Sequence, residues 1–595
     1  MIGQVVCVTE QLTLPTYREP PAEQLPMFAE NRVHQRSSGN PYPNRIVSDV
    51  DREHRENKTY TAIRLENEYL QLILLPELGG RIYSAYDKVN KYDFFYKQHV
   101  IKPALIGMLG SWISGGVEFN WPCHHRPSTF MPTDWSIQRE PTGAVTVWMS
   151  EHDPLDRMKG MVGIRLAPGE AIFETRMRVY NRTETRKSFL WWENAAVPVN
   201  EQYRLFFPHD VTYVQFHYRK DVTTYPLASG TYNGIPLGEN NVDLSFHKNT
   251  RQPTSYFCGE TRECFFGGYD EGRQCGVVHV ADRHTSVGKK MFTWAYNQLS
   301  NSWERALTDT DGAYAELMAS SYSLNQPDFA WLEPYETKKF SQAWYPIGKM
   351  GIPDHATEHA AIHLTSSGVT VQTTRIHTHA RLLCNGKEYA LAAIPCTPVT
   401  ISCGHVDSLQ ILDADDNVLL SYTPKSSDIT RMPETLPGLP TLDQITCAQD
   451  AYLAGVHVDQ YRDPTIRPDA YFQKALKLEP HHLPSLIAMA RYCYQLGKLD
   501  EAVSFVEQAE KTATRWNFHP ESGEIAYLKG LILQAQHKHA EAYDAYQQAC
   551  WNQDRRAAAM TRIACMDGCN ADFHAMLQHA ISALDANADN GLAIT

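Results

Sequence analysis

Apolar and polar residues alternate with a period of two along much of the first 350 residues, a pattern typical of strands with one buried face. The alternation is clearest in four runs, at residues 60–76, 81–86, 144–150 and 171–180. The polar triplet Glu66-Asn67-Glu68 interrupts the first run and predicts a turn between two strands. Because no helical periodicity separates the runs, we predict a large sandwich of antiparallel sheets over residues 1–350, with an N-terminal extension.

A second and smaller β pattern covers residues 355–425. Its short β-branched runs are joined by turn signals, of which Asn385-Gly386 is typical of a hairpin. We therefore predict a small accessory β-sandwich here. The next stretch, residues 426–444, is rich in proline, serine and threonine and predicts a linker.

From residue 445 to residue 595, apolar positions follow the 3.6-residue period of amphipathic helices. The segment that ends at Ala475 recurs at Ala509, 34 residues later, which is the period of tetratricopeptide repeats. The next match, at Ala549, lies 40 residues further on, and the excess falls within residues 516–523. An ordinary all-α bundle is the alternative, but the spacing favours helical repeats.

Composition narrows the classes of function. The formal net charge is −13 and lysine and arginine form no cluster, which argues against a nucleic-acid partner. The N-terminus lacks the pattern of a signal peptide and no run of about 18 apolar residues occurs, so we expect no membrane partner. Thirteen cysteines are scattered without metal-site spacing, as expected of reduced thiols in a cytoplasmic protein.

One turn-rich loop, residues 114–128, concentrates chemical groups. It contains a carboxylate, an amide, an indole, two imidazoles and a guanidinium, on Glu118, Asn120, Trp121, His124, His125 and Arg126. An indole packs on the C–H face of a sugar ring, and planar polar groups pair with its hydroxyls. We predict a carbohydrate site here; a structured loop whose polar groups satisfy one another is the alternative.

Glu316 is the second focus of candidate chemistry. It lies in an apolar strand, residues 314–319, where alternation puts it on one face with Tyr314 and Met318. A carboxylate in such a strand must be paired or take part in chemistry, because burial alone is costly. An acid paired with an arginine or with the backbone is the structural alternative.

Pro76-Glu-Leu-Gly-Gly-Arg81 and Tyr314-Ala-Glu316 resemble motifs of the aldose 1-epimerase (galactose mutarotase) superfamily. A wider pattern, which includes Gly115-Gly-Val-Glu-Phe-Asn-Trp-Pro122 and Trp191-Trp192, is similar to a bacterial family of unassigned function. Members of that family carry a mutarotase-like domain before tetratricopeptide repeats. The resemblance spans nearly the whole chain. It implies that residues 1–350 form an antiparallel β-supersandwich of the galactose mutarotase type, and it implies the domain order predicted above.

The superfamily uses a glutamate as the base on the anomeric hydroxyl and a histidine as the acid on the ring oxygen. The resemblance implies that Glu316 is the base. The position that corresponds to the acid falls near Trp191–Asn194 and holds Glu193 instead. His124 or His125 is then the candidate for a histidine acid.

Two carboxylates around an anomeric carbon are also the catalytic groups of a glycoside hydrolase. Their separation is about 5–5.5 Å in retaining enzymes and about 6.5–9.5 Å in inverting ones. Glu316 with Glu118 or Glu193 supplies such a pair, so we favour a hydrolase over an epimerase, with His125 as the alternative acid. The side chains expected to line the sugar site are Arg81, Asn120, Trp121, His124, Arg126, Trp192, His284, Lys289 and Trp294.

Two interpretations without catalysis stay open. One is a sugar-binding module whose helical repeats bind a protein partner, and the other is a structural assembly protein. The histidines give no spacing specific to a metal site, and no phosphate-cradling motif occurs, so we expect neither a metal nor a cofactor. The histidines that could bind a metal are His124, His125, His279 and His284.

Overall fold

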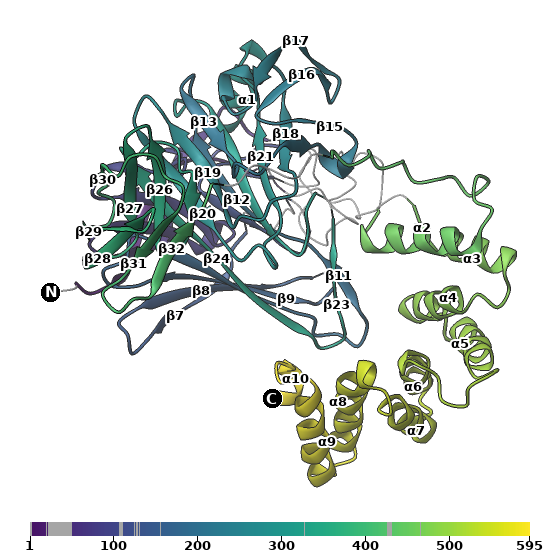
Figure 1. Cartoon of the computed structure of the whole chain (residues 1–595). Helices are drawn as coiled ribbons and strands as arrows, with labels where there is room; N and C mark the ends of the chain where they lie inside the picture. The colour runs from purple at the N-terminus through teal and green to yellow at the C-terminus, as the bar shows by residue number, and fades with distance from the viewer. Residues whose placement is uncertain are drawn as a thin grey trace.

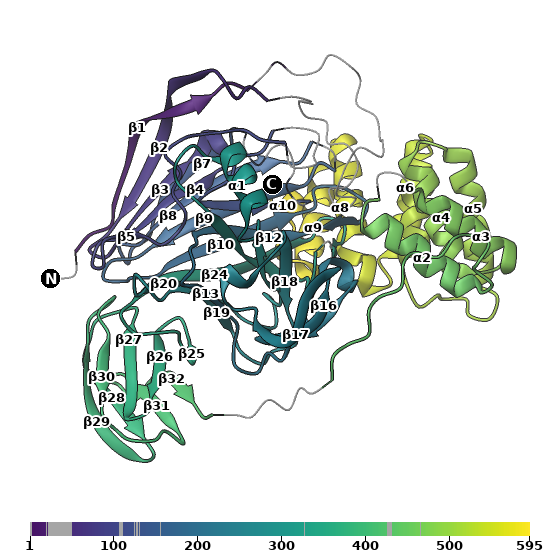
Figure 2. The same cartoon turned by 90° about the horizontal axis from the view of Figure 1, so that it is seen from above.

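The computed structural model describes residues 3–19, 21, 50–105, 111–123, 125, 129, 131–154, 156–326, 328–424, 431–463 and 466–595. Two antiparallel sheets packed face to face form the large β-domain (Figure 1). The small sandwich and the helices lie at opposite ends of this domain (Figure 2). The fold class expected from the sequence, a β-supersandwich with a small sandwich and helical repeats, is confirmed.

The larger sheet has twelve strands in the order β1-β2-β3-β4-β6-β12-β22-β21-β18-β14-β15, with β5 paired to β4. Its strands are β1 Val6–Tyr17, β2 Arg55–Glu66, β3 Leu70–Leu75, β4 Arg81–Asp87, β5 Tyr92–Asp93, β6 Val117–Asn120, β12 Trp191–Pro198, β14 Tyr213–Gln215, β15 Val222–Thr224, β18 Thr254–Cys258, β21 Lys289–Thr293 and β22 Tyr314–Ser321. Strand β1 pairs along its whole length with β2, so the N-terminal segment is an edge strand.

The second sheet has eight strands in the order β13-β19-β20-β24-β10-β9-β8-β7. They are β7 Asp134–Arg139, β8 Val145–His152, β9 Lys159–Leu166, β10 Phe173–Tyr180, β13 Tyr203–Phe206, β19 Phe265–Asp270, β20 Cys275–Val280 and β24 Thr337–Gly348. Its inner face packs on the larger sheet, because Phe173, Trp191 and Trp344 belong to one buried cluster. The domain is completed by β11 Lys187–Phe189 with β23 Ala330–Leu332, β16 Leu227–Tyr232 with β17 Ile235–Asp243, and helix α1 Gln298–Leu307.

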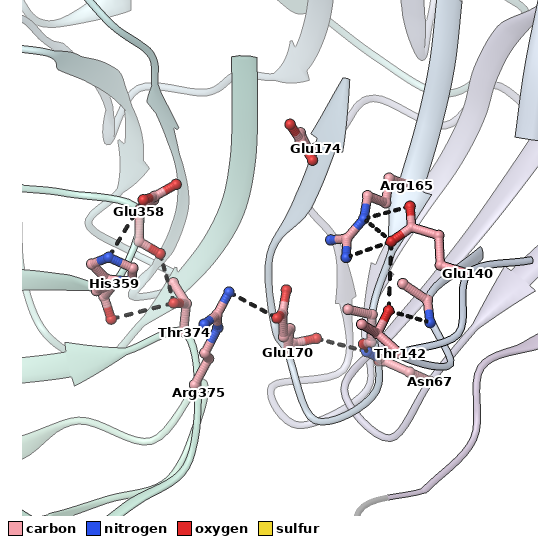
Figure 3. A network of polar contacts seen from close by, with 12 residues as sticks. Asn67, Glu140, Thr142, Arg165, Glu170, Glu174, Glu358, His359, Thr374 and Arg375 are labelled. Atoms are coloured by element: carbon pink, nitrogen blue, oxygen red, sulfur yellow. Dashed lines mark hydrogen bonds and ion pairs between the residues drawn. The ribbon is translucent and has the colours of Figure 1, made fainter. Parts of the chain in front are cut away.

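The small sandwich consists of two four-stranded sheets, β25-β26-β27-β30 and β29-β28-β31-β32. Its strands are β25 His355–Ala356, β26 Ala360–Thr365, β27 Gly368–Thr373, β28 His377–Cys384, β29 Lys387–Ala393, β30 Val399–Ile401, β31 Leu409–Leu412 and β32 Val418–Tyr422. Figure 3 shows its attachment to the large domain through an ion pair of 2.8 Å between Arg375 and Glu170. Asn67 Nδ2 donates to the backbone oxygen of Glu170 at 2.7 Å and fixes the same turn.

The C-terminal part is a series of antiparallel helix pairs, as the repeat period predicts. The helices are α2 Ala448–Gln460, α3 Pro468–Leu478, α4 Leu483–Gln495, α5 Leu499–Ala513, α6 Glu524–Ala535, α7 His539–Ala549, α8 Gln553–Cys569, α9 Phe573–Ala586 and α10 Gly591–Ile594. The predicted insertion, residues 516–523, is the loop between α5 and α6. Within the described ranges, no helix is long and apolar enough to cross a bilayer.

The helices curve around one side of the large β-domain, with β11 and β23 facing them (Figure 1). The end of α2 is attached to the segment that follows β22. The Tyr461 hydroxyl donates to Asp328 Oδ1 at 2.6 Å, and Gln460 Nε2 donates to the Phe329 carbonyl at 2.5 Å. The first helix pair is therefore fixed to a loop of the larger sheet.

Candidate functional site

The pairing register brings candidate side chains from four strands onto one face of the larger sheet. Asn194 of β12 is paired with Glu118 of β6 on one side and with Met318 of β22 on the other. Met318 is in turn paired with Lys290 of β21. Directly paired residues share a face, and Glu316 shares it because it is two residues from Met318. This is the face turned away from the eight-stranded sheet.

The Glu118 and His125 side chains are buried and in contact, with 3.1 Å between Oε2 and Nδ1. The backbone N–H of His125 donates to Asn120 Oδ1 at 2.6 Å, which holds the loop after β6. Trp112 Nε1 donates to Glu118 Oε1 at 3.0 Å, and Asn194 Nδ2 donates to Oε2 at 3.2 Å. Burial raises the pKa of Glu118, but the neighbouring positive charges and the donors outweigh it and lower the pKa to about 2. Glu118 is therefore a firmly held anion.

Glu316 has the opposite electrostatic character. It is 4% exposed, and burial is the largest effect on its carboxyl group, whose pKa is raised above the ordinary value. His125 and Lys290 act in the opposite direction. The Tyr314 hydroxyl donates to Glu316 Oε1 at 3.4 Å. A carboxyl group of this kind exchanges its proton at a higher pH than an ordinary glutamate, which suits general acid–base chemistry.

Lys290 is a buried basic group of the site. Burial lowers its pKa to about 7, while Glu316 acts to raise it. The Lys290 ammonium donates to Gln326 Oε1 at 2.5 Å and lies 3.4 Å from His217 Nε2. Burial, followed by the charge of Lys290, holds the pKa of His217 well below its usual value, so this ring is neutral.

Arg81 reaches the same face from β4. Its Nη1 donates to the Gly115 carbonyl at 2.8 Å, and its Nη2 has no hydrogen-bond partner among the described residues. Burial lowers the pKa of Arg81 to about 10, against the effect of Glu118. Trp294 Nε1 donates to the Tyr314 hydroxyl at 3.0 Å and so orients the phenol that contacts Glu316. Trp294 therefore acts on Glu316 through Tyr314, whereas Arg81 is held by backbone carbonyls.

The structure brings together many of the residues expected from the sequence. On this face, or in direct contact with it, lie Glu316, Glu118, His125, Arg81, Asn120, Trp192 and Trp294. Trp192 packs edge-on against Phe257, with 5.8 Å between ring centroids. His124 and Arg126 lie outside the described residues.

Three other expected binding residues do not lie with Glu316. Trp121 belongs to the core between the sheets, where its ring centroid is 5.8 Å from that of Phe189. Lys289 points to the opposite face from Lys290, because neighbouring residues of a strand alternate. His284 is exposed in a turn after β20, where its N–H donates to Asp282. The sugar site expected from the sequence is therefore corrected at these positions.

Glu193 also lies on the opposite face, so it cannot pair with Glu316 across the candidate site. It is fully buried between the sheets and accepts hydrogen bonds from the Thr175 hydroxyl and from Trp344 Nε1, the latter at 2.8 Å. Burial raises its pKa to about 7. We assign Glu193 to the core, which removes it from the carboxylates expected to react.

We expect Glu193→Gln to change the pH dependence of stability. A carboxyl group with a raised pKa contributes stability that is present below its unfolded-state pKa and is lost as the pH rises through about 7. Glutamine does not titrate. The free energy of unfolding of the variant, relative to that of the wild type, should therefore increase by about 2–3 kcal/mol from pH 5 to pH 8. Urea unfolding followed by tryptophan fluorescence at both pH values measures this. If the two proteins differed in free energy of unfolding by the same amount at pH 5 and at pH 8, the assignment of Glu193 to the core would be contradicted.

Sequence reasoning missed Asn194, Lys290 and His217. Both faces of β12 are buried, so alternation of polarity gives no indication that Asn194, rather than Glu193, faces the site. The pairing of Lys290 with Met318 distinguishes it from Lys289, but strand pairing is invisible in one sequence. His217 lies in a short 3-10 turn with no motif, next to Tyr218 at φ 59°.

His279 and His284, two of the possible metal ligands, lie apart from this face. His279 lies in the eight-stranded sheet, where it hydrogen-bonds Gln342 at 2.8 Å, and burial lowers its pKa to about 3. No cluster of three or more histidine, cysteine, aspartate or glutamate side chains suited to a metal ion occurs in the described part of the chain.

Comparison with known families gives one match that covers more than half of the chain. Residues 38–347 match the family described as "Domain of unknown function (DUF5107)". This range contains Glu118, His125, Lys290 and Glu316, so the whole candidate site lies inside it.

Comparison with solved structures gives similarity over the full length. A TPR-domain containing protein from Parabacteroides distasonis has a TM-score of 0.50 and 16% identity, covering 99% of this chain and 91% of that one. A putative mutarotase from Salmonella typhimurium has a TM-score of 0.35 and 8% identity, with coverage of 48% and 90%. A galactose mutarotase-like protein from Clostridium acetobutylicum has a TM-score of 0.34 and 10% identity, with coverage of 49% and 96%. Structures of both kinds expected from the sequence motifs are thus among the matches.

Proposed function

This chain belongs to the DUF5107 family, and on that premise we propose that its large β-domain is an enzyme that exchanges the anomers of a free sugar, as an aldose 1-epimerase does. The observation that carries the proposal is the position of Glu316 and the Glu118–His125 pair on one sheet face. After burial, the charge of His125 is the next largest influence on the pKa of the Glu316 carboxyl group, and it acts to lower that pKa. This supports the placement of the proposed base and acid in one site.

In the proposed reaction Glu316 removes the proton of the anomeric hydroxyl while His125 gives a proton to the ring oxygen. The bond between the anomeric carbon and the ring oxygen breaks, and an open-chain aldehyde forms. Rotation about the adjacent carbon–carbon bond and reclosure by the reverse proton transfers give the other anomer. Both proton transfers fall to groups within the site, so no cofactor is needed.

The neighbours of these two groups have supporting roles. Glu118 contacts His125 Nδ1 and so orients the ring, as the carboxylate of a catalytic triad does. Lys290 keeps a cation near Glu316 and counteracts the effect of burial on that carboxyl group. Arg81 has an unused donor, Nη2, which suits a sugar hydroxyl. The low pKa of Glu118, about 2, makes it unsuited to be the general acid that a hydrolase requires.

A glycoside hydrolase is the second candidate, with the roles of the carboxylates exchanged. The surroundings of Glu316 raise its pKa and those of Glu118 lower it, and such a separation is typical of an acid and an anion that share one glycosidic bond. Glu316 would then be the acid and Glu118 the nucleophile or base. The donors on Glu118 reduce its nucleophilicity, which is why this candidate ranks second.

Anomer-resolved NMR distinguishes the two candidates. The full-length protein is added to a panel of freshly dissolved aldoses and, separately, to aryl glycosides and short oligosaccharides. We expect α/β exchange of at least one aldose to accelerate, with no release of reducing sugar. Release from a glycoside, without faster exchange, would replace the proposal by the hydrolase. Binding of a sugar with neither reaction would support a non-catalytic module instead.

A further inference from the structure

A large cavity lies between the β-domain and the inner side of the helical repeats. It has a volume of about 1180 Å³. Residues 183–188 and 331 line it from the β-domain, and Val458, Asp459, Arg462, Arg491 and Tyr492 are among the residues that line it from the helices. Figure 1 shows β11 and β23 on the side of the β-domain that faces α2 to α6. The cavity is slightly larger than ordinary small-molecule sites, which measure about 300–1,000 Å³. Both walls belong to one chain, so a small molecule fits this space better than a protein partner.

Arg186 is the most exceptional group of the cavity wall. Its guanidinium stacks on Trp331 at 4.3 Å from the ring centroid. Its Nε has no hydrogen-bond partner, and no carboxylate within the described residues forms an ion pair with it. Burial lowers the pKa of Arg186, and the neighbouring charge of Arg491 acts in the same direction. The guanidinium groups of Arg186 and Arg491 are thus close enough to influence each other, and that of Arg186 lies on Trp331 without an ion pair among the described residues.

Asp459 is the matching carboxylate. It lines the same cavity at the end of α2, and burial raises its pKa although Arg186 and Arg491 act to lower it. No ion pair of Asp459 occurs among the described residues, so the carboxylate and the guanidinium of Arg186 influence each other without contact. The other charges of the wall are mostly paired: Arg462 with Asp156 at 2.7 Å, Lys187 with Asp156 at 3.3 Å, and Arg491 with Glu524 at 2.6 Å.

We propose that this cavity binds a small hydroxylated anion, a molecule with a carboxylate or phosphate group and several hydroxyls. The oxyanion would take the planar donors of Arg186 and the free donors of Arg491, because a guanidinium matches either group with two parallel hydrogen bonds. A hydroxyl of the same molecule would donate to Asp459, and the aromatic residue Tyr492 lines the same cavity. Such a ligand satisfies both unpaired charges at once, which neither a neutral sugar nor a bare anion does.

The ligand would join the two parts of the chain, because Arg186 belongs to the β-domain and Asp459 and Arg491 belong to the helices. The proposal does not rest on the function proposed above, since no residue of the cavity lies on the face that carries Glu316.

Calorimetric titration of the full-length protein with glucose 6-phosphate, glucuronate, glucose and inorganic phosphate tests the proposal. We expect one or both of the anionic sugars to bind, with an affinity that falls about tenfold or more in Arg186→Gln and in Asp459→Asn. Binding of glucose 6-phosphate would identify the anionic group as a phosphate, and binding of glucuronate would identify it as a carboxylate. Arg178→Gln is the matched control, because Arg178 stacks on Trp148 at 4.7 Å but is exposed on the outer surface.

Two results would overturn the proposal: no binding of either anionic sugar that depends on Arg186, or equal affinities for inorganic phosphate and glucose 6-phosphate. Arg186→Lys keeps the charge without the planar fork and gives the same comparison should Arg186→Gln fail to fold. Anomer exchange should be unaltered in Arg186→Gln, so the result stands whether or not the β-domain proves to be an epimerase.

Discussion

Glu316→Gln is expected to lower the rate constant of anomer exchange by about three orders of magnitude, equivalent to about 4 kcal/mol in activation free energy. The amide has the shape of the carboxylate and keeps contact with Tyr314, but it cannot accept the proton of the anomeric hydroxyl. Exchange spectroscopy on the aldose found to be the best substrate measures the effect. Substrate affinity should change little, because the lost interaction is one that forms in the transition state.

Glu193→Gln is the matched control for this experiment. Glu193 is equally buried and lies three strand positions from Ala196, the residue paired with Glu316, but it faces the core between the sheets. Its replacement should leave the exchange rate unchanged. In the wild type, the rate should decline as the pH falls through the pKa of Glu316, which is raised above that of an ordinary glutamate because of burial. Undiminished exchange in Glu316→Gln would exclude Glu316 as the base.

His125→Asn should reduce the rate constant by about two to four orders of magnitude. Asparagine can still hydrogen-bond Glu118, but it has no proton to give to the ring oxygen at neutral pH. Glu118→Gln should cause a smaller loss, since it leaves the imidazole present but weakens its orientation. The measurement is the same exchange experiment, with kcat and KM determined separately.

His284→Asn serves as the control for the histidine experiment, because His284 is exposed in a turn away from this face. A loss confined to KM in His125→Asn would indicate a binding role for this histidine. A loss in Glu118→Gln larger than that in His125→Asn would instead favour the hydrolase, in which Glu118 itself reacts.

The fold could be predicted from local patterns because each of its parts has its own period. Strand alternation around Glu66-Asn67-Glu68 gave two strands and their turn, and the structure has β2 and β3 there. The 34-residue recurrence at Ala475 and Ala509 corresponds to α3 and α5, which occupy equivalent places in successive helix pairs. Such signals depend only on neighbours in sequence, so one chain suffices to find them.

The candidate site was only partly predictable because it depends on which face each strand presents. Alternation placed Glu316 correctly with Tyr314, but it could not distinguish Glu193 from Asn194 in a strand buried on both sides. For the same reason the sequence led us to predict Lys289 as the binding residue, whereas Lys290 is the lysine on the face of Glu316. These choices are decided by hydrogen-bonded pairing between strands far apart in sequence, which no local pattern contains.

The attachment of α2 has a consequence for how such proteins can evolve. Gln460 and Tyr461 hold the segment at Asp328 and Phe329, and the same loop carries Gln326, the hydrogen-bond partner of Lys290. A gene fusion that joined this β-domain to an unrelated helical array would remove these two attachments unless the new first helix offered an amide and a phenol at the same two positions. One helical array therefore cannot simply replace another. The sequence of the first helix should change in evolution together with that of the β-domain loop it contacts.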